Sequence, residues 1–133
     1  MTPTENHADD DRTWYRTFCG LPGQIREARR FVRAHIPGSP DVELVASELG
    51  TNAMRHTDSG RSGGTFRVRI EHRPDGSTRL EVEDDGGPAD FETPTADHTR
   101  EGGRGLSLVQ ACATAWGVKG DAGGRTVWAE FPP

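Results

Sequence analysis

A polar stripe on a helical segment, residues 47–56, is the feature that most constrains the fold of this chain. Glu48, Asn52 and His56 recur every four residues, so on an α-helix their side chains lie nearly above one another. The apolar face beside them is expected to consist of Leu44, Val45, Leu49 and Ala53. The stripe is either the solvated face of an amphipathic helix or a point where a carboxylate, an amide and an imidazole converge.

Hydrophobic periodicity predicts three helices and five strands along the chain. Apolar residues at helical spacing indicate helices over residues 24–35, 40–56 and 106–115, with Ser39 as N-cap of the second helix. Strands are expected over 13–19, 66–71, 80–84, 116–119 and 126–131. We therefore predict an α+β fold, a two-layer sandwich in which a mixed, mostly antiparallel sheet packs against three helices on one face.

Composition limits the classes of protein that the chain can belong to. The chain has 133 residues, of which 32% are hydrophobic, and its formal net charge is -5. We expect residues 1–12 to be a disordered tail and residues 13–133 to form a single domain. The acidic balance disfavours nucleic acid as a partner, and no apolar stretch approaches the roughly 18 residues of a membrane helix. A cytoplasmic protein is expected.

Two cysteines, Cys19 and Cys112, are the complete set in this sequence. Neither has a neighbouring cysteine or histidine at metal-ligand spacing. We therefore predict that both are buried and act as small apolar residues.

An acidic turn follows the strand that is predicted to end at residue 84. Asp84 and Asp85 are followed by Gly86 and Gly87. Glycines let a ligand approach the backbone closely, and a carboxylate at a strand end can accept hydrogen bonds from an amino group. The same residues are also typical of an ordinary tight turn. Asp85 is expected to point to the opposite face of the strand from Asp84, outside any site.

A glycine-rich loop runs directly into the third predicted helix. Gly102, Gly103 and Gly105 flank Arg104, and Leu106 begins the helix. Exposed amide groups and the positive end of the helix dipole favour anions there. Neither a lysine-containing phosphate loop nor a dinucleotide fingerprint is present, so a nucleotide would need a different type of site. The long connection over residues 86–103 is typical of either a functional lid or a disordered segment.

These signals, in this order, resemble the ATP-binding fold of histidine kinases, gyrase, the Hsp90 chaperone and the MutL repair protein. The motifs are E-L-x-x-N-A-x-x-H, D-x-G and G-R-G-L-x-L-V, followed by residues 124–128. The pattern is most similar to the anti-sigma-factor serine kinases and their actinobacterial relatives. The resemblance covers about residues 14–131 and implies the Bergerat-type ATP-binding fold. One departure is Pro88, which stands where the wider superfamily often has a glycine.

The resemblance assigns roles to residues by their positions in these motifs. It implies that Asn52 is the Mg²⁺ ligand, that Glu48 is the general base, and that Asp84 accepts the adenine amino group. Gly86 would leave room for the ring, and Thr126 would support either Asp84 or an ordered water from the neighbouring strand. The ATP phosphates would lie over Gly103, Arg104, Gly105 and Leu106. His56 lies at the helix end, where it is either a neighbour of the nucleotide site or a cation that favours the helix dipole without any catalytic role.

The function implied by the resemblance is regulatory phosphorylation in transcription control. The chain would be a serine/threonine-protein kinase that acts as an anti-sigma factor. It would use ATP and Mg²⁺ to phosphorylate an anti-sigma-factor antagonist, and it would bind a sigma factor when that antagonist is absent. Dimerisation is common among such proteins. Two alternatives stay open: a non-catalytic ATP-binding module for partner switching, and a nucleotide-free interaction domain.

Overall fold

The structure is a computed structural model that describes residues 6–8, 12–87, 106–121 and 123–133. Its strands are β1 (Asn6–Ala8), β2 (Arg12–Cys19), β3 (Thr65–His72), β4 (Thr78–Asp84), β5 (Ala115–Asp121) and β6 (Gly124–Phe131). Its helices are α1 (Gln24–His35), α2 (Pro40–His56) and α3 (Leu106–Cys112), with a 3₁₀ turn, η1, at Asp58–Gly60. None of the helices in the described ranges is long and apolar enough to cross a membrane.

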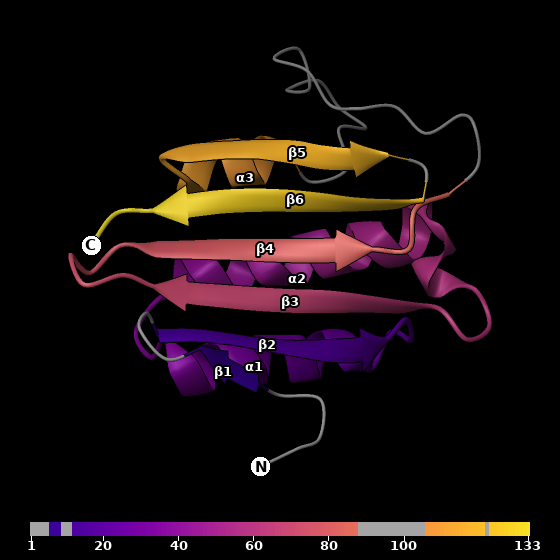
Figure 1. The fold of residues 1–133 in the computed structure, drawn as a ribbon, viewed down its shortest axis with the longest axis horizontal. Coiled ribbons are helices and arrows are strands. Elements are labelled where there is room, and N and C mark those ends of the chain that lie inside the picture. The colour runs from indigo at the N-terminus through magenta and orange to yellow at the C-terminus, as the bar shows by residue number, and fades with distance from the viewer. Residues whose placement is uncertain (1–5, 9–11, 88–105, 122) are drawn as a thin grey trace.

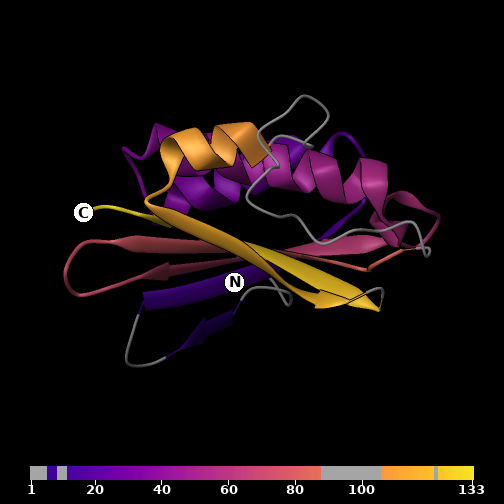
Figure 2. The same cartoon turned by 90° about the horizontal axis from the view of Figure 1, so that it is seen from above.

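The six strands form one sheet in the order β1-β2-β3-β4-β6-β5 (Figure 1). Helices α1, α2 and α3 all lie on one side of this sheet (Figure 2). The predicted α+β sandwich is therefore confirmed. The expectation of a mixed sheet is wrong for the described strands, since every strand pair among them is antiparallel.

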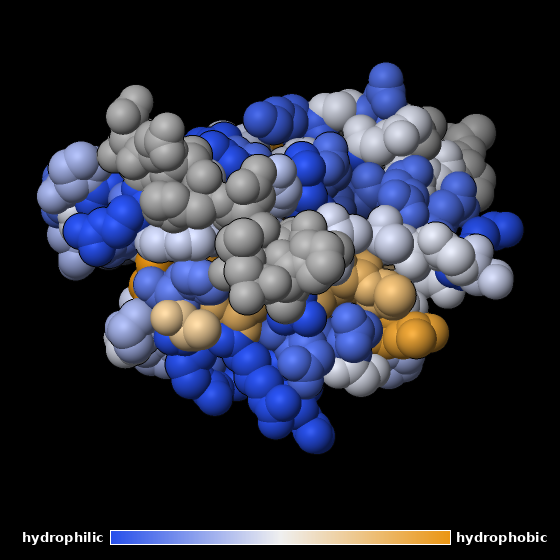
Figure 3. All heavy atoms as spheres, turned by 60° about the horizontal axis from the view of Figure 1, so that its bottom comes forward, coloured by the Kyte–Doolittle hydropathy of each residue, from blue (hydrophilic) through white to orange (hydrophobic). Residues whose placement is uncertain are grey.

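The core lies between the sheet and the helices, because alternate strand residues point toward α1 and α2. Val68 and Leu80 are fully buried on neighbouring strands, and Val32 and Val45 are fully buried on the two helices above them. The surface is mostly hydrophilic in the view that brings the lower edge of Figure 1 forward (Figure 3). The hydrophobic effect therefore holds the two layers together.

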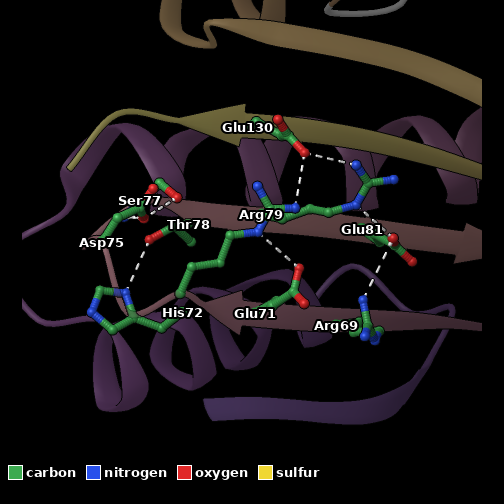
Figure 4. Close-up of polar contacts among 10 residues, drawn as sticks. Arg69, Glu71, His72, Asp75, Ser77, Thr78, Arg79, Glu81 and Glu130 are labelled. Atoms are coloured by element: carbon green, nitrogen blue, oxygen red, sulfur yellow. Dashed lines mark hydrogen bonds and ion pairs between the residues drawn. The ribbon is translucent and has the colours of Figure 1, made fainter. Parts of the chain in front are cut away.

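None of the described helices lies on the other face of the sheet, which carries many charged side chains (Figure 4). Arg79 and Arg73 both donate to Glu130, at 2.9 and 3.0 Å, and so link β4 and the β3–β4 turn to β6. Arg79 also donates to Glu81 at 2.9 Å, and its guanidinium lies 4.4 Å from the ring centroid of Trp128. Because neighbouring strands contribute opposite charges, this face is polar without being repulsive.

Strand β1 was not expected, since residues 1–12 were predicted to be disordered. Residues 6–8 pair with β2 in the register Asn6 to Tyr15 and Ala8 to Thr13. An edge strand is held by main-chain hydrogen bonds, which need no apolar side chain. Composition therefore missed this element.

Several local predictions also need correction. Cys19 is exposed and Cys112 is only partly buried, because Cys19 occupies an outward position at the end of β2. Leu44, expected on the apolar face of α2, is 38% exposed. Ser39 is the N-cap of α2 but makes no side-chain capping hydrogen bond. Helix α3 ends at Cys112 rather than at residue 115, where β5 already begins.

Candidate functional site

Helix α2 presents the polar stripe at the border between the core and the surface. Glu48 and Asn52 are partly buried, whereas His56, at the C-terminal end of the helix, is exposed. Leu49 and Ala53, on the adjacent face, are each 3% exposed and belong to the core. Packing of this apolar face fixes the rotation of α2 and so keeps the carboxylate and the amide at the edge of the helix layer.

The chain leaves α2 through a compact turn that is held by its own side chains. The hydroxyl of Thr57 donates to the carbonyl of Ala53 and accepts a 3.0 Å hydrogen bond from the amide of Ser59. Both Thr57 and Ser59 are buried. Asp58–Gly60 form the 3₁₀ turn η1 directly after α2, and Thr57 is its N-cap.

This turn is hydrogen-bonded to the acidic turn that follows β4. The amide of Asp58 donates to the carbonyl of Gly86 at 2.6 Å, and the amide of Asp85 donates to the hydroxyl of Ser59 at 2.9 Å. Asp85 in turn accepts a 2.9 Å hydrogen bond from the amide of Thr65 on β3. The end of α2 and the D-x-G motif, about thirty residues apart in the chain, are thus one connected structural unit.

Close backbone packing in this unit requires glycine. A Cβ atom at Gly20 would lie 1.7 Å from the carbonyl oxygen of Ser59, and one at Gly64 would lie 2.3 Å from the same atom. The backbone amide of Gly20 also donates to the carbonyl of Gly64 at 3.0 Å. Glycine at these two positions therefore allows the neighbouring backbone segments to pack in direct contact.

Asp84 is the buried carboxylate of this region. It is 6% exposed, and its Oδ1 accepts hydrogen bonds from the amides of Gly86 at 2.7 Å and Arg125 at 3.3 Å. Its Oδ2 lies 3.5 Å from the Nε atom of Arg125. Burial raises the pKa of Asp84, and the backbone and guanidinium donors partly oppose that rise.

Arg125 is a site residue that the sequence did not reveal. It is 5% exposed and lies directly opposite Asp84 in the pairing of β4 with β6. The alternation of side chains along β6 could have indicated it, since Arg125 points to the same buried side of the strand as Val127 and Ala129. A charged residue at an inward position of a strand indicates a buried partner.

The strand pairing does not place Thr126 beside Asp84, as direct support of that carboxylate would require. Thr126 pairs with Glu83 and lines a hollow on the uncovered face of the sheet, whereas Asp84 is on the helix-facing side. Successive strand residues point to opposite faces, so Thr126 and Asp84 are separated by the sheet. Arg125 takes the place next to Asp84.

Other predicted site residues fall at or beyond the limits of the described structure. Gly103, Arg104 and Gly105, together with Pro88, lie outside the described residues. Leu106 is the first residue of α3 and is buried at 4% exposure. Within the described ranges no group of three or more His, Cys, Asp or Glu residues could hold a metal ion; the predicted Mg²⁺ ligand, Asn52, is an amide.

Comparison with protein families matches residues 18–131 to the histidine kinase-like ATPase domain. This match covers most of the chain, which belongs to that family. It supports ATP binding and agrees with the observed sandwich of an antiparallel sheet and three helices. A search of curated proteins found no match. The family thus defines the class of site, and the residues around Asp84 define its local chemistry.

Proposed function

We propose that this protein binds ATP and Mg²⁺ and phosphorylates a serine of an anti-sigma-factor antagonist in the cytoplasm. The observation that carries the ATP-binding part is the buried carboxylate of Asp84 on a turn that is pinned to the end of α2 by the Asp58–Gly86 hydrogen bond. Membership of the histidine kinase-like ATPase family supports the same conclusion. The kinase activity, its partner and sequestration of a sigma factor rest on the motif resemblance.

The residues present fit an adenine nucleotide. Asp84 offers a carboxylate oxygen as acceptor for the exocyclic amino group. Gly86 has a φ of 77°, a conformation that favours glycine, and carries no side chain to obstruct the ring. On α2, the amide oxygen of Asn52 suits Mg²⁺, which prefers oxygen ligands and commonly bridges phosphate oxygens.

Glu48 would act one helical turn before Asn52 on the same face of α2. In the proposed reaction its carboxylate accepts the proton of the serine hydroxyl as that oxygen bonds to the γ-phosphorus of ATP. The bond from the γ-phosphorus to the bridging oxygen breaks, and ADP leaves. The products are phosphoserine, ADP and a protonated Glu48, so positioning and electrostatics supply most of the catalysis.

The test is to incubate the full chain with γ-labelled ATP, Mg²⁺ and candidate antagonists encoded by the same genome. Label is expected on serine, and Glu48→Ala should keep ATP affinity but lose transfer by about a hundredfold or more. Glu83→Ala is the matched control, because Glu83 is exposed on the opposite face of the sheet. ATP binding without transfer to any antagonist would favour the non-catalytic partner-switching module. Full transfer by Glu48→Ala would overturn the assignment of the base.

A further inference from the structure

The side chain that shares the buried environment of Asp84 is Arg125. The two residues face each other across the β4–β6 pair, and their side chains are only 4% and 6% exposed. The arginine Nε lies 3.5 Å from Oδ2, and the arginine amide lies 3.3 Å from Oδ1. Arg125 thus contacts both oxygens of the carboxylate that is assigned to the nucleobase.

Burial of this kind makes the charge state of Asp84 depend on its partner. A carboxylate taken out of water favours its neutral form, and a nearby guanidinium restores the ionised form. Within the described residues, Arg125 is the only cation that forms an ion pair with Asp84. Arg61, which directly follows the 3₁₀ turn η1, pairs with Asp58 instead, at 2.9 Å, and its side chain is 72% exposed.

We propose that Arg125 is a positioning residue that holds Asp84 ionised and oriented, and thereby makes the site select a nucleobase with an amino group over one with a carbonyl oxygen. This inference rests on the proposed ATP binding. An ionised carboxylate accepts from the 6-amino group of adenine but repels the 6-oxygen of hypoxanthine, because both atoms are then acceptors. Burial makes such a mismatch costly.

The hydrogen bonds around Asp84 show why orientation and charge act together. Gly86 and the amide of Arg125 occupy Oδ1, which leaves Oδ2 as the oxygen available to a base. Oδ2 is also the atom nearest the guanidinium. Loss of the positive charge would therefore act at the oxygen that recognises the base, while the backbone hydrogen bonds to Oδ1 would persist.

The experiment measures the affinities of ATP and inosine triphosphate, each with Mg²⁺, by titration calorimetry on the full chain. The unmodified protein should prefer ATP by about tenfold or more. Arg125→Met should narrow this preference by about tenfold, and Arg125→Lys should retain most of it because the charge is kept. Arg67→Met is the control, because Arg67 forms a 3.1 Å ion pair with Glu83 on the opposite face of the sheet from Asp84. Loss of that ion pair should leave the ratio of the two affinities unchanged.

The ratio of two affinities measured on one preparation is insensitive to partial loss of folded protein. If Arg125→Met does not fold, carbon NMR of the Asp84 carboxyl in the unmodified protein is read instead, and it should report a carboxylate at about pH 7. An unchanged ratio in folded Arg125→Met, or a protonated Asp84 at that pH, would overturn the inference. Failure of the unmodified protein to bind either nucleotide would instead overturn the proposed function.

Discussion

The amide of Asp58 donates a 2.6 Å hydrogen bond to the carbonyl of Gly86. This contact joins the turn at the end of α2 to the turn after β4, and a second hydrogen bond from Asp85 to Ser59 lies beside it. The helix that carries Asn52 is thereby held in a fixed relation to Asp84. Both proposed contacts with the nucleotide depend on this local structure.

Gly20→Ala should destabilise the protein by more than about 2 kcal/mol. The added Cβ would lie 1.7 Å from the carbonyl oxygen of Ser59, so the backbone of the turn would have to move. Gly23→Ala is the matched control, because a Cβ there meets no atom within 4 Å, and it should change stability by less than about 1 kcal/mol. Urea unfolding followed by circular dichroism measures both, and equal effects would contradict the packing described.

Ser59→Ala should cost about 1–2 kcal/mol of unfolding free energy. Its side chain is fully buried, and its hydroxyl accepts the hydrogen bond from the amide of Asp85, which alanine would leave unsatisfied. Ser62→Ala, at an exposed position in the same segment, should change stability by less than about 0.5 kcal/mol. Chemical denaturation measures the unfolding free energy of both variants. An equal loss of unfolding free energy in the two would refute this role of Ser59.

Glu130→Gln should make the protein less sensitive to acid. The hydrogen bond from Arg79, with that from Arg73, lowers the pKa of Glu130 from its ordinary value of 4.5. Its contribution to stability is therefore present above that value and is lost as the pH falls through the lowered pKa. The variant should be less stable than the unmodified protein at about pH 7, and the difference in stability should shrink as the pH falls below 4.5 and through the lowered pKa.

Thermal unfolding across that pH range measures the convergence. Glu27→Gln is the control, since its ion pair with Arg30 is largely exposed and should contribute little at any pH. The difference in stability between Glu130→Gln and the unmodified protein could instead stay constant from neutral to acid pH. That result would show that the charge of the Glu130 carboxylate does not cause the difference.

Asn52→Ala should weaken ATP binding by about tenfold or more when Mg²⁺ is present, because the proposed metal ligand is removed. With the metal chelated, the affinities of the variant and the unmodified protein should agree. Thr51→Ala, at the adjacent and partly buried position of α2, serves as the control. A loss of affinity that is the same with and without Mg²⁺ would indicate that Asn52 contacts the nucleotide itself.

The helices were the most predictable part of the fold. The spacing of apolar residues gave α1 at residues 24–35 and α2 at residues 40–56, as the structure has them, because helical periodicity is a local property. Strand β1 was missed because main-chain pairing leaves no pattern in the side chains. The exposure of Cys19 was missed because a residue's average preference for burial does not fix its position at a strand end.

The candidate site was predictable where its residues follow one another in the chain. The spacing of Glu48 and Asn52 and the turn after Asp84 could be read directly from the sequence. The partner of Asp84 could not, because it depends on the register between β4 and β6, which places Arg125 opposite Asp84 and Thr126 on the other face. A shift of register by one residue exchanges the faces, and motif spacing does not report that register.

The most direct test of nucleotide binding at this site is a calorimetric titration of the full chain with ATP and Mg²⁺. Saturable binding of one ATP per chain is expected, with a dissociation constant below about 1 mM. Binding should weaken when Mg²⁺ is chelated. The absence of any binding by folded protein at that concentration would contradict the proposed role of the Asp84 turn and the α2 stripe.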